Sequence, residues 1–157
     1  MSDFLAIEKY VPHRGSMLLI ERLLEAGEEH AVAQVRVARD GMFVQQQGVP
    51  SWVAIEYMAQ TVAAWAGWRA VQNGEPVKIG FLLGSRKFEA MQAFFAPAAV
   101  LRVEVRCELV GSNGLGMFDC QVFEKGLLVA RARISVFEPG DGAAYLQALE
   151  SEGNKNE

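Results

Sequence analysis

Apolar and polar residues alternate along the second half of the chain. Nearly every second position of residues 98–110 is apolar, which is the period of a half-buried strand. The Gly-Ser-Asn-Gly sequence at residues 111–114 is typical of a hairpin turn and leads into a return run at residues 115–123. A second tight turn precedes residues 127–137. We therefore expect three long antiparallel strands in this part of the chain.

The first half of the chain has a less regular pattern. A short helical turn is predicted at residues 4–10, and two apolar runs follow at residues 17–26 and 31–37. The second of these runs alternates and is read as a strand. A further strand is predicted within the apolar run at residues 77–88.

Residues 51–71 are apolar on most sides and predict one long helix. Pro50 and Ser51 supply its start, since a Ser side chain can cap free amides, and no further Gly or Pro appears before Gly67. A helix of this kind cannot lie on a surface, so the sheet must curl around it in an α+β fold. Such a sheet leaves open edges, and pairing with a second chain into a dimer is the usual remedy.

Glu56 is a carboxylate within this apolar helix. Its neighbours three and four positions away are Trp52, Val53, Ala59 and Gln60, so no basic residue of the helix can pair with it, and a polar partner is expected from elsewhere. A carboxyl group buried among apolar groups has a raised pKa, which suits general acid catalysis. The alternative is a residue at the helix start that faces solvent and is favoured by the macrodipole.

Composition and charge narrow the class of protein. The 157 residues are 51% hydrophobic, which predicts a single domain over residues 1–140, followed by a short helix at 143–149 within a flexible tail. A net charge of −4 without a basic stripe argues against nucleic-acid binding. No signal peptide or long apolar run is present, so a cytoplasmic protein without a membrane span is expected. Cys107 and Cys120 lack CxxC spacing, so neither a metal nor another cofactor is predicted.

Two motifs carry a family resemblance. Residues 11–22, VPHRGSMLLIER, resemble the LPHRYPFLLVDR segment of the hotdog-fold 3-hydroxyacyl-acyl carrier protein dehydratases, and residues 55–60, IEYMAQ, resemble their (L/I)EAMAQ. The resemblance extends from about residue 5 to Phe137. Within this family the first segment is most similar to the dehydratase-like subunits of aryl polyene gene clusters. The resemblance implies a hotdog fold, a curled antiparallel sheet wrapped around one long central helix.

The resemblance also implies a catalytic pair that is shared between two protomers. In the family, a His of one protomer and the Glu of the other remove water from a 3-hydroxyacyl thioester, while amides at the helix start polarise its carbonyl. Glu56 matches the family's Glu. The family's His lies in a GHFP motif fourteen residues earlier, where this chain has Met42 between Gly41 and Phe43. Met cannot transfer a proton, although it fills apolar gaps well.

The remaining site candidates follow from the same alignment. His13 is a possible replacement for the missing His, but it lies in a segment to which the family assigns no proton transfer. His30, in an acidic turn, is expected to be a solvated surface residue. The candidates for substrate binding flank the lost His, the helix start and the second motif: Met42, Phe43, Ser51, Trp52 and Gln60.

The chain retains the family's Glu as Glu56 but lacks its His, and this combination favours a heteromeric dehydratase. Its partner would be a His-bearing hotdog subunit, with a homodimer as the alternative, and its substrate an acyl thioester on an acyl carrier protein. Two other functions remain open. A hotdog thioesterase can use a single helix carboxylate to activate water, and a non-catalytic acyl-binding or scaffold subunit needs no chemistry from Glu56.

Recognition of an acidic carrier protein requires a local basic patch on this acidic chain. Arg86 and Lys87 are the first candidates, and we expect them near a tunnel mouth. Arg14 and Arg22 are weaker candidates. An ordinary solvated strand end is an equally good explanation for Arg86 and Lys87, since surface charges are common.

Overall fold

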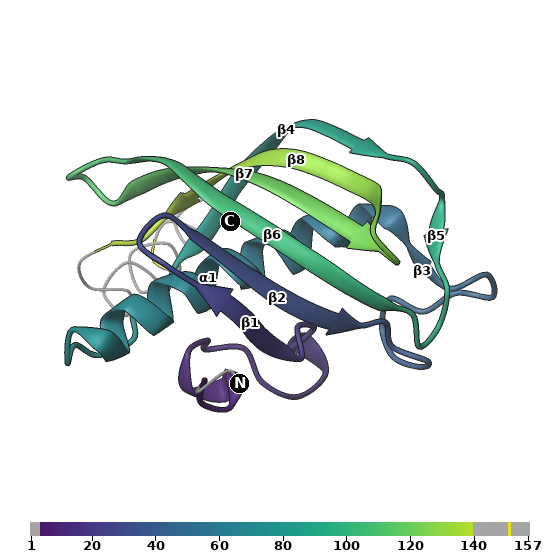
Figure 1. Ribbon diagram of the computed structural model, residues 1–157, viewed down its shortest axis with the longest axis horizontal. Coiled ribbons are helices and arrows are strands. Elements are labelled where there is room, and N and C mark those ends of the chain that lie inside the picture. The colour runs from purple at the N-terminus through teal and green to yellow at the C-terminus, as the bar shows by residue number, and fades with distance from the viewer. Residues whose placement is uncertain (1–3, 140–150, 152–157) are drawn as a thin grey trace.

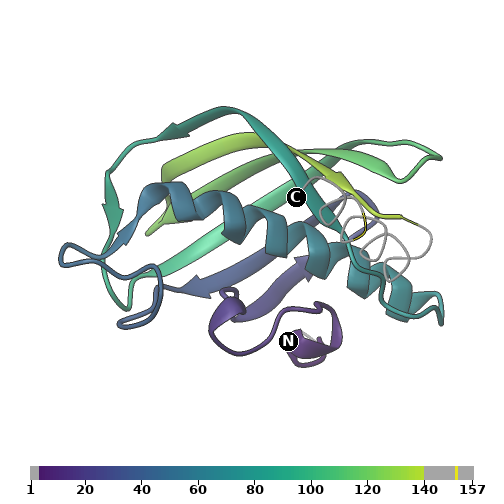
Figure 2. The same cartoon turned by 180° about the vertical axis from the view of Figure 1, so that it is seen from behind.

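The computed structural model describes residues 4–139 and residue 151, and it is built on a six-stranded antiparallel sheet in the order β1-β2-β6-β7-β8-β4. The sheet curls around one long helix, α1, which crosses its concave face (Figures 1 and 2). This arrangement is the predicted α+β hotdog fold. The strands of the sheet are β1 (Arg22–Ala26), β2 (His30–Arg36), β4 (Phe81–Ala90), β6 (Val100–Val110), β7 (Leu115–Glu124) and β8 (Leu127–Phe137).

The three long strands predicted from the alternating pattern are β6, β7 and β8, and the turn at residues 111–114 joins the first two. The earlier predictions were less accurate. The apolar run at residues 17–26 starts at the last residue of the 3-10 turn η2 (Gly15–Met17) and contains only the short strand β1. The helical turn predicted at residues 4–10 is the 3-10 turn η1 (Ile7–Lys9).

A short strand pair lies at the start of the helix and was not predicted. It joins β3 (Val49–Pro50) to β5 (Phe94–Phe95). Strands of two residues have no periodicity that a sequence pattern can reveal. The helix predicted at residues 143–149 lies outside the described residues.

The long helix begins differently from the prediction. A 3-10 turn, η3 (Ser51–Val53), precedes α1 (Ala54–Gln72), and neither start has a side-chain cap hydrogen bond. The prediction that Ser51 caps the helix is therefore wrong. Ser51 is already inside the first turn, and its backbone N–H donates to the Ala93 carbonyl at 2.9 Å.

The core lies between α1 and the concave face of the sheet. Met58 of α1 and Leu101 and Val103 of β6 are fully buried. Trp65 packs edge-on against Phe118 of β7, with ring centroids 5.4 Å apart, and its indole N–H donates to the Gly27 carbonyl at 2.9 Å. This packing explains why α1 is apolar on most sides.

The N-terminal segment packs directly against the backbone of α1. Gly67 makes this possible, because a Cβ at this position would overlap the Tyr10 carbonyl. Tyr10 and Val11 are both buried at this contact. The segment that follows Val11 is therefore held beside the helix.

One edge of the sheet is formed by β4, most of whose residues are exposed. An open edge of this kind can pair with another chain. The dimer predicted from it stays a prediction.

Within the described part of the chain, no helix is both long and apolar enough to cross a membrane.

Candidate active site

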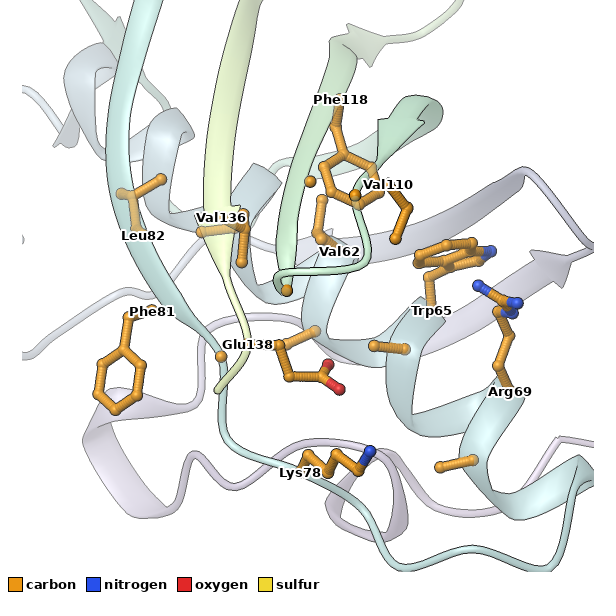
Figure 3. Close-up of a pocket in the computed structure, with 18 of the residues that line it drawn as sticks. Val62, Trp65, Arg69, Lys78, Phe81, Leu82, Val110, Phe118, Val136 and Glu138 are labelled. Atoms are coloured by element: carbon orange, nitrogen blue, oxygen red, sulfur yellow. The ribbon is translucent and has the colours of Figure 1, made fainter. Parts of the chain in front are cut away.

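A cavity of about 660 Å³ runs along one side of α1, between the helix and the ends of β4, β7 and β8 (Figure 3). The helix contributes Glu56, Ala59, Ala63, Ala66 and Ala70, whose spacing of three and four residues places them on one face. Apolar side chains form the middle of the cavity, among them Val62, Trp65 and Phe118. Such a cavity suits an elongated, largely apolar ligand.

His13 and Glu56 meet at this cavity. The His13 Nε2 lies 3.9 Å from Glu56 Oε1, and the two side chains are 27% and 33% exposed. The separation is too long for a hydrogen bond. The burial predicted for Glu56 is thus only partial in this chain.

Burial is the main influence on the pKa of His13, which lies below its usual value of 6.5. The Glu56 carboxylate acts to raise this pKa, and the Arg14 guanidinium acts to lower it. His13 Nδ1 is buried and has no hydrogen-bond partner among the residues that the structure describes. A neutral imidazole with an unpaired nitrogen is able to accept a proton.

Arg14 holds the backbone around His13. Its guanidinium donates to the carbonyls of Val11 at 2.6 Å, His13 at 2.7 Å and Glu8 at 2.8 Å. These hydrogen bonds stabilise a loop that belongs to no β-strand pair. Arg14 therefore serves the local fold, which weakens its candidacy as a carrier-binding residue.

Gln60 links Glu56 to the N-terminal segment. It is fully buried, and its Nε2 donates to Glu56 Oε1 at 3.2 Å and to the Met17 carbonyl at 2.8 Å. Its Oε1 accepts the N–H groups of Leu19 at 2.9 Å and Ile20 at 3.4 Å. Glu56 thus has a polar partner on its own helix, contrary to expectation. Gln60 is absent from the cavity lining, so this geometry gives no support to direct substrate binding.

The other substrate-binding candidates lie apart from this pair. Met42 is 66% exposed and Trp52 is 57% exposed, while Phe43 is half-buried with its ring perpendicular to that of Trp52 at 6.0 Å. None of these three residues lines the cavity, and Ser51 does not line it either. Met42 does not fill an apolar gap within this chain, because most of its side chain is exposed.

The helix-start amides are only partly available. The Ser51 N–H, which was expected to contact a substrate carbonyl, already donates to the Ala93 carbonyl. Trp52 is the next residue of the same turn. Its amide is the better candidate for an interaction with a thioester carbonyl.

The basic residues at the cavity differ from those expected. Arg86 and Lys87 lie on the exposed edge strand β4 and do not line the cavity, so their position near a tunnel mouth stays a prediction. Arg69 and Lys78 line it instead, and Figure 3 shows Arg69 on α1 and Lys78 on the segment that leads from the helix to β4. Arg69 stacks at 4.7 Å over the Trp65 ring. The sequence could have indicated this contact, because Arg69 follows Trp65 by four residues, which is one helical turn.

Charges of both signs line the cavity. Glu75 and Glu138 contribute to its lining together with Arg69 and Lys78, and the Glu138 carboxylate points into the cavity in Figure 3. His30, the remaining His, begins β2 and is half-buried rather than fully solvated. Among residues 4–139 and 151, no cluster of His, Cys, Asp and Glu is arranged to hold a metal ion.

Comparisons with known proteins agree with this fold. The model of the ApeP-like family, described as ApeP dehydratase, matches residues 5–147. The 3-hydroxyacyl-[acyl-carrier-protein] dehydratase FabZ of Acinetobacter baylyi is 27% identical over 143 residues, which cover 85% of this chain and 93% of that protein.

Solved structures show the same fold. A chain of the dehydratase heterocomplex ApeI:P from Xenorhabdus doucetiae superposes with a TM-score of 0.84 and 29% identity, covering 93% of this chain and 98% of that one. A hypothetical thioesterase from Streptococcus pneumoniae, solved with coenzyme A, has a TM-score of 0.59 and 16% identity over 76% of this chain and 86% of that one, which shows the fold alone. With its family model matched over nearly the whole length, the chain belongs to the ApeP-like dehydratase family.

Proposed function

We propose that this chain is one subunit of a heteromeric dehydratase that acts on 3-hydroxyacyl thioesters of an acyl carrier protein, and that it supplies Glu56 to a shared active site. The single observation that carries the proposal is the position of Glu56 on an elongated cavity. The motif alignment supports it, because Met42 falls where the family has its His, so this chain would supply only the Glu of the pair. The structural similarity to a chain of a dehydratase heterocomplex supports a partner subunit.

The proposed dehydration requires two catalytic groups, a base and an acid. A base removes the proton from C2 of the acyl chain, a double bond forms between C2 and C3, and the C3 hydroxyl leaves as water after an acid protonates it. In the proposed complex the His of the partner subunit acts as the base and Glu56 as the acid. The Trp52 amide, at the helix start, stabilises the negative charge that develops on the thioester oxygen.

The cavity provides space for the acyl chain. It is apolar where Val62 and Trp65 lie near Phe118 (Figure 3), and Glu56 is also part of its lining. An acyl chain that extends from the reacting carbons along α1 would bury its methylene groups there, each of which contributes about 0.8 kcal/mol. Turnover of a series of thioesters with different acyl chains would identify the preferred acyl length and the natural thioester.

A conservative substitution tests the proposal. In the assembled complex, Glu56→Gln keeps the shape of the side chain but removes the acid, so we expect dehydration to be lost while assembly is retained. Glu28→Gln, an exposed carboxylate in the turn before β2, is the matched control and should leave the rate unchanged. Full turnover by the Glu56→Gln complex would contradict the proposal.

The same assay separates the two other functions. A thioesterase would release free thiol from acyl-coenzyme A or from an acyl carrier protein, and Glu56 as a single carboxylate is compatible with that reaction. A scaffold subunit would bind acyl carrier protein without any turnover in the complex. Thiol release that depends on Glu56, in the absence of dehydration, would favour the thioesterase.

A further inference from the structure

Gln60 is a fully buried polar side chain that contacts both parts of the candidate site. It reaches Glu56 on α1 and three backbone groups of the segment that follows His13. We propose that Gln60 is a positioning residue, which holds Glu56 and the His13 segment in a fixed relation. Its effect on turnover rests on the proposed function, but its effect on the geometry does not.

The orientation of the Gln60 amide follows from its partners. Two backbone N–H groups, those of Leu19 and Ile20, converge on one atom, which must therefore be the carbonyl oxygen. The amide nitrogen then faces the Met17 carbonyl and the Glu56 carboxylate. A flipped amide would place oxygen against oxygen at both of these contacts. The donor that contacts Glu56 is thus set by the backbone on the other side of Gln60.

The backbone that Gln60 binds connects η2 to the sheet. Glu21 is the first residue of this connection to join β2, through its N–H and the Gln34 carbonyl at 2.8 Å. Before that point, Met17, Leu19 and Ile20 bond to the Gln60 side chain. If this connection shifted, residues 12–14, which include His13, would move with it. Gln60 would then lose its hydrogen bond to Glu56.

Substituting Gln60 by Met tests this role, because Met has a similar length but replaces none of the four hydrogen bonds. Gln72→Met, at the exposed end of the same helix, is the matched control. In the complex we expect Gln60→Met to lower kcat by on the order of 10²-fold through misplacement of Glu56, with a smaller change in KM. The control should leave both constants unchanged.

The titration of His13 provides a test that needs no turnover. The Glu56 carboxylate raises the His13 pKa against the effects of burial and Arg14. Glu56→Gln should therefore lower this pKa, as measured by NMR of the imidazole. In the Gln60→Met background the same substitution should lower it by a clearly smaller amount. An equal decrease in both backgrounds would overturn the proposal, whether or not the complex catalyses dehydration.

A second measurement applies if Gln60→Met does not fold. The Gln60 side-chain NH₂ protons of the otherwise native chain should exchange slowly with solvent, and their chemical shifts should change on Glu56→Gln, because one proton loses its carboxylate acceptor. Rapid exchange, or shifts that do not respond to Glu56→Gln, would overturn the role of Gln60 in positioning Glu56.

Discussion

The Nε2 of His13 lies 3.9 Å from Glu56 Oε1, although the two residues come from the N-terminal segment and from α1. Three features account for this proximity. Gly67 lets Tyr10 approach the helix, Arg14 braces the loop, and Gln60 binds the connection that follows it. The catalytic candidates of this chain are thus held by residues that carry no chemistry of their own.

The first prediction concerns pH and stability. Because the pKa of His13 lies below 6.5 in the fold, the unfolded chain binds a proton that the folded chain does not over the pH range just below that value. The free energy of unfolding should therefore rise with pH through this range and fall on acidification. His13→Gln should flatten the dependence, as measured by urea denaturation at a series of pH values. Identical pH dependence in the two proteins would contradict this.

The second prediction concerns the contact between the N-terminal segment and α1. Gly67→Ala introduces a Cβ that overlaps the Tyr10 carbonyl, so it should destabilise the fold by about 1–3 kcal/mol despite the higher helix propensity of Ala. Chemical denaturation measures the change. Gly84→Ala, where a Cβ meets nothing within 4 Å, is the control. Equal stability of Gly67→Ala and the native chain would show that the segment can move away.

The third prediction concerns the length of the acyl chain. Ala63→Phe should fill the cavity beyond Glu56 and reduce kcat/KM for long acyl thioesters by on the order of tenfold, while short ones are still turned over. A substrate series with the complex measures this. Val71→Phe, at an exposed position of the same helix, controls for added aromatic bulk. Equal losses for short and long chains would show that the acyl group lies elsewhere.

The fourth prediction concerns carrier binding. Arg86 and Lys87 are exposed on β4, and we propose that they attract the acidic carrier. Reversing both to Glu should weaken association, most strongly at low salt, because exposed charges are screened as ionic strength rises. Fluorescence anisotropy with labelled carrier measures the affinity. An unchanged affinity at low salt would remove Arg86 and Lys87, and the same reversal of Arg69 and Lys78 would then test the basic residues at the cavity.

Local patterns predicted much of the fold. The alternation in residues 98–137 indicated β6, β7 and β8, because each strand is long enough to show its period and has one buried face. The apolar helix and the curled sheet followed from the need to bury α1 on most sides. The two-residue strands β3 and β5 were missed, since they depend on pairing across distant parts of the chain.

The site was harder to predict than the fold. The motifs predicted Glu56 as a site residue, and their alignment placed Met42 where the family has its His. They did not reveal that Gln60 bonds to Glu56 and to the backbone near Met17, because side-chain contacts across the fold leave no periodic signal. The hydrogen bond of the Ser51 amide could not be predicted for a related reason. This amide is already bonded to Ala93, a residue far along the chain.

The central claim is that Glu56 acts in an active site completed by a partner subunit. The most direct measurement is the hydration of a trans-2-enoyl-carrier thioester, first by the folded chain alone and then by its complex with a His-bearing hotdog subunit. We predict no turnover by the chain alone and turnover by the complex. Clear activity of the chain alone would contradict a shared site and would direct attention to His13 as the second proton-transfer group.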